Sequence, residues 1–140
     1  CSDELNEASK KFEIRNFGYI KEQEKMNEFF SMADVLLNPS VYETFGLVNI
    51  EAMASGTPVV AFNICVMPEV IGIEGGWIVK EVSADALYSC LESLEKDRAE
   101  VEKKAGTCVE CVREYYDEEE MLDAFDRLYE TIKKERQNGR

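Results

Sequence analysis

The sequence contains no histidine, and its five cysteines show neither a disulfide framework nor a complete set of zinc ligands. Cys1, Cys65 and Cys90 stand at irregular spacings, and an odd number of cysteines argues against a secreted disulfide scaffold. Cys108 and Cys111 form one C-x-x-C pair, but a zinc site needs two further ligands. The sequence therefore predicts free thiols, with Cys108 and Cys111 on a helix, and a reducing cytoplasm as the protein's location.

Positive charge is also scarce in this chain. Sixteen lysine and arginine residues stand against 29 aspartate and glutamate residues, which gives a formal net charge of −13 at pH 7. A protein that binds nucleic acid or an anionic membrane surface presents a basic face to the phosphates. The charge balance therefore argues against both as main partners, and the acidic residues after Glu81 are expected on solvated helix faces.

Long apolar runs are absent as well. No segment approaches the length of a membrane-spanning helix, and no signal peptide is visible. The 140 residues are 45% hydrophobic, which predicts a single domain with a substantial core. Because the chain begins with Cys1 instead of methionine, we expect a fragment of a longer protein.

Short apolar runs alternate with helical periodicities along the first part of the chain. Residues 12–20 are predicted to form a short strand that stops in a turn at Gly18, and further strands are predicted at 34–40, 57–63 and 75–80. Helices are predicted at 2–10, which could also be the end of a longer helix, and at 21–33, 46–56 and 68–71. Such alternation is typical of doubly wound sheets. The sequence therefore predicts the α/β class, with a Rossmann-like parallel sheet and helices on both of its faces.

From Ser83 onward the chain is expected to form a helical C-terminal tail. Asp117 and Glu120 resemble a capping box at the start of the last helix. The apolar residues that follow repeat at helical spacing. They are predicted to face the core: Met121, Phe125, Leu128 and Ile132.

Two glutamates, Glu43 and Glu51, flank a segment that is otherwise mostly apolar. In doubly wound sheets, ligands bind at the carboxyl ends of the strands, often at the start of a helix. A helix that begins near Phe45 or Gly46 would present the free N–H groups of residues 45–48 to phosphate oxygens. Glu51 could then accept hydrogen bonds from vicinal hydroxyls, so the arrangement suits a sugar nucleotide. The spacing also allows a surface loop glutamate and an exposed helix glutamate, because such pairs are common.

The stretch ADVLLNPSVYETFGLVNIEAMASGTPVVA, at 33–61, resembles the donor-binding motif of GT-B glycosyltransferases of the group 1 (family 4) type. These are retaining enzymes that use nucleotide sugars. Weaker agreement continues through FGYI, MPEVIG and GGWIV. The resemblance implies that residues 1–140 are part of a donor-binding domain, the C-terminal domain of a GT-B fold. It also implies that the first strands of that domain and a whole acceptor-binding domain lie outside this chain.

The resemblance implies roles for individual residues. Glu43 would bind hydroxyls of the donor sugar and is the candidate catalytic residue, and Glu51 would bind the ribose hydroxyls. Backbone amides at the helix start would hold the diphosphate, and the residues after Gly18 would lie near the base. In full, the implied donor-binding residues are Glu43, Phe45, Gly46, Leu47, Val48, Glu51, Tyr19 and Ile20.

One position departs from the family pattern. The family usually has a glycine pair in the loop before "PE", and this chain has Cys65 and Val66 there. A loop without those glycines has less room and less backbone freedom. The departure is the one hint that donor binding has been lost.

The resemblance also fixes which partners we expect. The nucleotide sugar is a substrate, no other cofactor or metal is required, and the sequence has no Asp-x-Asp cluster. The acceptor, a glycan, a lipid or a small molecule, would bind the absent domain, and the fragment alone is expected to transfer nothing. We expect a cytoplasmic protein, with a peripheral position at the membrane as an alternative for its full length. A homodimer is also expected as an option, because an incomplete sheet exposes an edge.

Three other interpretations of the sequence stay open. The chain could be a non-catalytic interaction module with a glycosyltransferase-like fold. It could also belong to an epimerase or a phosphorylase, because a fold does not determine its chemistry. A flavodoxin-like signalling domain is disfavoured, because it needs an aspartate at a strand end and Asp34 precedes its predicted strand.

Overall fold

The structure is a computed structural model and describes residues 12–72 and 74–138. Three parallel strands form a sheet in the order β1-β2-β3, namely β1 (Leu36–Asn38), β2 (Val59–Phe62) and β3 (Gly76–Val79). Leu36 pairs with Val59, and Val59 pairs with Gly76. The strands predicted at 34–40, 57–63 and 75–80 are therefore confirmed.

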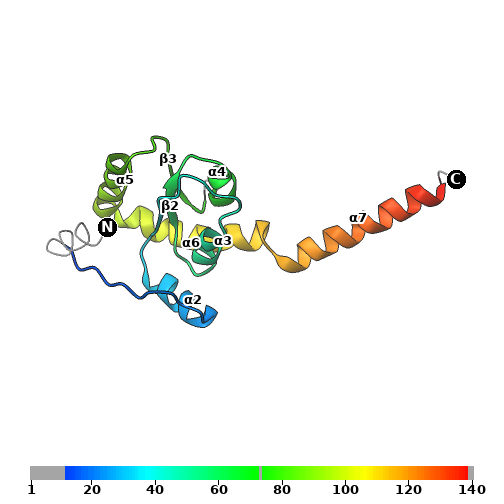
Figure 1. The fold of residues 1–140 in the computed structure, drawn as a ribbon, viewed down its shortest axis with the longest axis horizontal. Helices are drawn as coiled ribbons and strands as arrows, with labels where there is room; N and C mark the ends of the chain where they lie inside the picture. Colours follow the sequence, from blue (N-terminus) through cyan, green and yellow to red (C-terminus); the bar gives the residue numbers. More distant parts are fainter. Residues whose placement is uncertain (1–11, 73, 139–140) are drawn as a thin grey trace.

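Helices precede, connect and follow these strands (Figure 1). α2 (Gln23–Met32) precedes β1, α3 (Leu47–Ala54) joins β1 to β2, and α4 (Met67–Ile71) joins β2 to β3. After β3 the chain is helical, in α5 (Ala84–Lys96), α6 (Arg98–Tyr115) and α7 (Glu118–Asn138). This order confirms the predicted helices between 21 and 71 and the helical C-terminal tail.

The central strand β2 is buried on both of its faces, as a short apolar run of this kind predicts. Successive strand side chains point to opposite faces of a sheet. Val59 and Ala61 pack with buried side chains of α2, α3, α4 and α6. Val60 and Phe62 pack on the other side with buried side chains of α5 and the start of α6. The α/β class with helices on both faces is therefore confirmed.

The predicted strand at 12–20 is wrong, because this segment has no regular secondary structure. A strand needs a partner for its backbone N–H and C=O groups, and the described sheet does not extend to this segment. Instead, the ring of Phe17 packs on Phe29 of α2, with ring centroids 4.4 Å apart. The helix predicted at 2–10 lies outside the described residues.

Helix α7 extends away from the body of the molecule as a long arm (Figure 1). The carboxylate of Asp117 accepts hydrogen bonds from the N–H groups of Glu119 (2.9 Å) and Glu120 (3.1 Å), so the predicted helix cap is present. The predicted core face is wrong, because no other described element packs against α7 to any extent. Its apolar side chains are exposed at Met121, Phe125, Leu128 and Ile132.

The cysteines that the structure describes are unpaired: Cys65, Cys90, Cys108 and Cys111. Burial raises the pKa of the Cys108 thiol to about 11, which keeps it protonated at neutral pH. Within 12–72 and 74–138 no cluster of acidic, cysteine or histidine side chains is suited to hold a metal ion. In the same ranges no helix has both the length and the hydropathy that a bilayer crossing requires.

Candidate functional site

The two predicted carboxylates lie on either side of the start of α3, beyond the end of β1. Glu43 stands in the loop 39–46, and one of its carboxylate oxygens accepts a hydrogen bond from the N–H of Thr44 at 2.9 Å. Glu51 stands just over one turn into α3. Both side chains are half-buried, and neither has an ion-pair partner among the described residues. Their free oxygens can therefore accept hydrogen bonds from hydroxyl groups.

Helix α3 begins at Leu47, and Gly46 precedes it with a left-handed backbone (φ 79°). The helix therefore starts one residue after the later of the two predicted positions, and Phe45 lies outside it. Glycine reaches this φ without strain, and other residues do not. The position also has no room for a side chain. A Cβ on Gly46 would lie 2.7 Å from the Asn49 side-chain nitrogen.

The first turn of α3 presents unpaired backbone donors. The N–H of Asn49 already bonds to the carbonyl oxygen of Gly46 at 2.9 Å. Those of Leu47 and Val48 have no partner inside the helix, and both residues are exposed. No side chain caps this helix. Its positive dipole end and these two amides can therefore hold an anion such as a phosphate.

A buried pair of asparagines, which the sequence pattern did not indicate, supports this loop. The side-chain N–H₂ of Asn38 donates to the side-chain oxygen of Asn49 at 2.9 Å. The side-chain N–H₂ of Asn49 donates in turn to the sulfur of Met67 at 3.1 Å. Asn49 is fully buried and Asn38 nearly so. Polar side chains with this burial indicate a structural constraint on the loop above them.

A tyrosine supports the loop from a second direction. The ring of Phe45 meets that of Tyr116 edge to face, with centroids 6.4 Å apart at 84°. The Tyr116 hydroxyl donates to the carbonyl oxygen of Val70 in α4 at 3.3 Å. The pKa of this hydroxyl is raised, mainly because the side chain is partly buried. Tyr116 directly follows α6, so the end of that helix touches both α4 and the loop.

The two residues predicted near the base, Tyr19 and Ile20, have few contacts with the rest of the candidate site. Tyr19 is 86% exposed, and Ile20 is half-buried. Both lie in the irregular segment before α2. No hydrogen bond or ring contact in the described residues joins Tyr19 to the loop 39–46, so its role stays a prediction.

Cys65 stands where the family usually has glycine, and its backbone is left-handed (φ 45°). The loop before α4 therefore keeps a glycine-like backbone at this position without a glycine. An L-residue in this conformation is strained by roughly 1–2 kcal/mol. Cys65 thus has a backbone that glycine reaches without strain, whereas Val66, the second of the two positions, is right-handed (φ −84°).

We expect Cys65→Gly to raise the free energy of unfolding by about 0.5–1 kcal/mol, because relief of the strain exceeds the entropy that glycine adds to the unfolded chain. Urea denaturation measures the change. Val66→Gly is the matched control, because the backbone of Val66 is right-handed, with φ −84°, and carries no such strain. Val66→Gly should lower the free energy of unfolding. If Cys65→Gly lowered it too, the inference that Cys65 is strained would be wrong.

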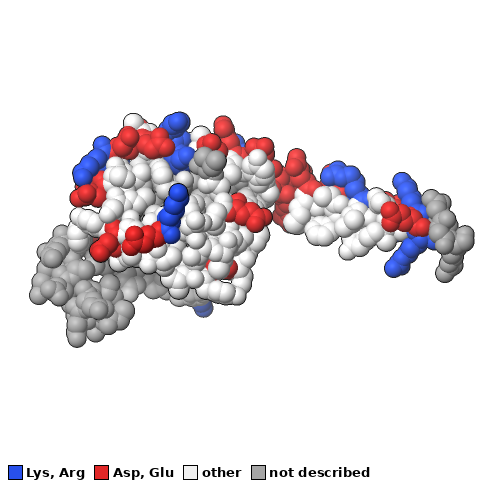
Figure 2. All heavy atoms as spheres, turned by 90° about the horizontal axis from the view of Figure 1, so that it is seen from above, with Lys and Arg blue, Asp and Glu red and all other residues white. Residues whose placement is uncertain are grey.

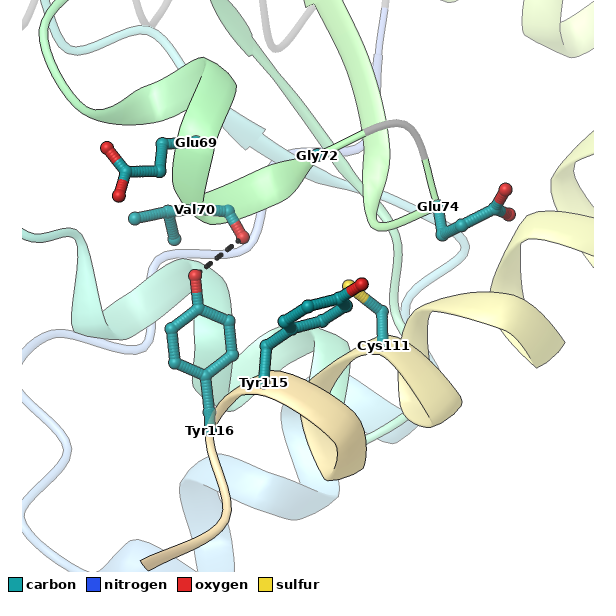
Figure 3. A pocket seen from close by; sticks show the side chains of 7 residues that line it. All are labelled: Glu69, Val70, Gly72, Glu74, Cys111, Tyr115 and Tyr116. Atoms are coloured by element: carbon teal, nitrogen blue, oxygen red, sulfur yellow. Dashed lines mark hydrogen bonds between the residues drawn. The ribbon is translucent and has the colours of Figure 1, made fainter. Parts of the chain in front are cut away.

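A separate cavity of about 590 Å³ lies between the end of α4 and the end of α6. Figure 3 shows the rings of Tyr115 and Tyr116 beneath it, with Glu69 and Glu74 at opposite sides. None of the predicted donor-binding residues lines it. No lysine or arginine lines it either among the described residues, so its charge does not suit a diphosphate.

Charges of both signs are interspersed on the face of the molecule that Figure 2 shows. Among the described residues visible there, no broad basic surface appears. The pattern agrees with acidic side chains on solvated helix faces, as the sequence predicted.

The chain superposes on sucrose-phosphate synthase from Thermosynechococcus elongatus with a TM-score of 0.80 and 30% identity, over 94% of this chain and 33% of that one. It is 30% identical over 134 residues to an uncharacterised 41.2 kDa protein in the cps region of Klebsiella pneumoniae, covering 92% of this chain and 36% of that protein. It is 36% identical over 85 residues to O-antigen chain mannosyltransferase B of Escherichia coli, covering 60% of this chain and 22% of the enzyme.

The chain thus spans 22–36% of the length of these three proteins. Its structural similarity to this synthase, a protein with the GT-B fold, confirms the predicted Rossmann-like α/β class. Residues 2–110, most of the chain, match the family described as glycosyl transferases group 1. The chain belongs to the glycosyl transferases group 1 family.

Proposed function

We propose that the protein containing this chain transfers a sugar from a nucleoside diphosphate sugar to an acceptor, and that this chain provides the donor site. The observation that carries the proposal is the start of α3. The backbone N–H groups of the exposed residues Leu47 and Val48 have no partner inside the helix, and a half-buried carboxylate without an ion-pair partner in the described residues precedes and follows them in the chain. Amides suit a diphosphate and carboxylates suit hydroxyls, so together they match both parts of such a donor.

Each carboxylate has a distinct role in this proposal. Glu51, inside the helix, accepts hydrogen bonds from the ribose hydroxyls. Glu43, in the loop, accepts hydrogen bonds from the donor sugar and orients its anomeric carbon. Neither contacts the phosphates, because like charges repel. Gly46 provides the left-handed backbone that precedes the two amides, at a position where a side chain would meet Asn49, and Tyr19 and Ile20 lie near the base.

The chemistry requires stabilisation of the charge that builds on the leaving diphosphate. The amides of Leu47 and Val48 provide part of it through the helix dipole. The segment 36–66 contains no lysine or arginine. In this proposal the remaining positive charge comes from elsewhere in the protein, and the 140-residue chain alone transfers nothing.

We further propose that the enzyme is of the family 4 type, transfers a hexose with retention of anomeric configuration, and needs no metal. Similarity to the O-antigen chain mannosyltransferase supports an acceptor that is part of a polysaccharide. The unpaired thiols that the structure describes fit a cytoplasmic location. The presence of both Glu43 and Glu51 weighs against the interaction module.

The test is a donor screen with the intact protein. Incubation with UDP-glucose, GDP-mannose or ADP-glucose, each with a panel of oligosaccharide, lipid and small-molecule acceptors, should transfer the sugar and release nucleoside diphosphate from one donor in preference to the others. NMR of the product gives the configuration at the transferred carbon, which we expect to match that of the donor. A product with inverted configuration would contradict the family 4 assignment. If no nucleoside diphosphate were released from these donors, or from other UDP, GDP and ADP sugars, the proposed transfer would be wrong.

A further inference from the structure

We infer that Asn38 and Asn49 act together as positioning residues for the donor loop, and we call this pair the asparagine clamp. The inference rests on the proposed function, because the loop it concerns is the proposed diphosphate site. Neither residue contacts the donor in the proposal. The clamp acts through the backbone of residues 39–46, which it holds at both ends.

The two ends of the loop are tied to the same buried pair. At the beginning of the loop, the N–H of Ser40 donates to the side-chain oxygen of Asn38 at 3.1 Å. At its end, the N–H of Asn49 donates to the carbonyl oxygen of Gly46 at 2.9 Å. The 2.9 Å bond between the two side chains closes the connection. The backbone bond from Asn49 to Gly46 does not depend on the side chain at position 49. The two side chains therefore act on the loop through the bond to Ser40 and through the packing of Asn49 against Gly46.

The clamp also reaches the element beyond β2. The side chain of Asn49 donates to the sulfur of Met67, the first residue of α4. It also fills the space against Gly46, where a Cβ would lie 2.7 Å from its nitrogen. One fully buried side chain thus fixes the left-handed residue that precedes the free amides of Leu47 and Val48.

Stability alone does not explain two asparagines at these positions. Replacing both partners of a buried hydrogen bond with apolar groups of similar shape is close to neutral for folding. Leucine has the same branched arrangement of four side-chain heavy atoms as asparagine, is bulkier, and suits a core that already contains Met53, Met67 and Ile71. What leucine cannot provide is an acceptor for the N–H of Ser40. The paired amides therefore serve the loop more than the core.

The test separates folding from the position of the phosphate site. Calorimetric titration of the intact protein with UDP, GDP and ADP identifies the nucleotide that binds best. The same protein is then titrated with the matching nucleoside, which lacks phosphates. The ratio of the nucleoside Kd to the nucleoside diphosphate Kd measures what the phosphate contacts contribute. A residue with only a structural role would not change this ratio in the folded protein.

The main variant is the double replacement Asn38→Leu with Asn49→Leu. We expect a thermal midpoint close to that of the wild type, unchanged nucleoside binding and a Kd ratio reduced about tenfold. A second variant, Met67→Leu, removes the sulfur that accepts the hydrogen bond from Asn49. Its control is Met53→Leu, because Met53 is equally buried and its sulfur makes no hydrogen bond in the described residues. We expect Met67→Leu to reduce the ratio about threefold and Met53→Leu to leave it unchanged.

Three results would overturn the inference. A folded double variant that keeps the wild-type ratio would show that the clamp does not position the loop. If the double variant does not fold, equal ratios in Met67→Leu and Met53→Leu would lead to the same conclusion. If the wild type binds neither the nucleosides nor the diphosphates, the proposed donor site itself fails and the clamp has no site to position.

Discussion

Replacing Gly46 with alanine should abolish measurable donor binding at concentrations that saturate the wild type. The new methyl group would lie 2.7 Å from the buried Asn49 nitrogen, and the residue would have to keep a φ of 79°. A left-handed alanine costs roughly 1–2 kcal/mol before any clash is counted. Either the loop moves away from α3 or Asn49 leaves its partners, and both outcomes displace the proposed phosphate site.

Gly56→Ala is the matched control for this change. Gly56 lies just past the other end of α3 with a φ of 84°, and a Cβ there meets only Val109 at 3.8 Å, an ordinary contact. Both variants should therefore lose stability through the backbone, by about 1–2 kcal/mol in the control and more in Gly46→Ala. Urea denaturation and nucleotide titration measure the two effects. Equal donor affinity in the two folded variants would show that Gly46 is not part of the site.

Glu43→Gln should reduce the turnover number of the intact enzyme about 100-fold with little change in the binding of nucleoside diphosphate. In the proposal, Glu43 contacts the donor sugar and not the nucleotide. Glutamine keeps an oxygen that can accept the 2.9 Å bond from the N–H of Thr44, so the loop should keep its shape. The loss then reports the carboxylate charge near the reacting carbon.

Steady-state kinetics with the preferred donor and a separate titration with its nucleoside diphosphate test this expectation. Glu92→Gln is the control, because Glu92 lies on α5, on the other side of the sheet, and forms an exposed ion pair with Lys96. The control should retain full activity. An unchanged turnover number in Glu43→Gln would remove Glu43 from the chemistry, and an equal loss of nucleotide affinity would place it against the nucleotide.

The sequence predicted the three strands of the described sheet and the helix start beside Gly46, because both depend on local patterns. The run from Val59 to Phe62 is apolar at every position, so it fits a strand buried on both faces wherever the chain folds. Gly46 and the carboxylates of Glu43 and Glu51 belong to one continuous motif. Their placement at one helix start needed no knowledge of distant contacts.

The features that the sequence did not predict depend on contacts between distant segments. Asn49 has the sequence neighbourhood of a polar helix residue, and it becomes a buried partner only when Asn38 and Met67, 11 and 18 positions away, meet it. The contact between Phe45 and Tyr116 joins segments that are further apart still. The exposed apolar side chains of α7 show a second limit of prediction from sequence. Apolar periodicity indicates which side of a helix is suited to burial, but it does not indicate which element covers that side.

The most direct measurement of the central claim is a calorimetric titration of the intact protein with UDP, GDP and ADP, repeated with Glu51→Ala and Glu69→Ala. Glu51 belongs to the proposed site at α3, and Glu69 lines the separate cavity of about 590 Å³ between α4 and α6. We predict that one nucleotide binds, that Glu51→Ala weakens it about tenfold or more, and that Glu69→Ala leaves it unchanged. Binding that survives Glu51→Ala and is lost in Glu69→Ala would contradict the account and move the nucleotide site to that cavity.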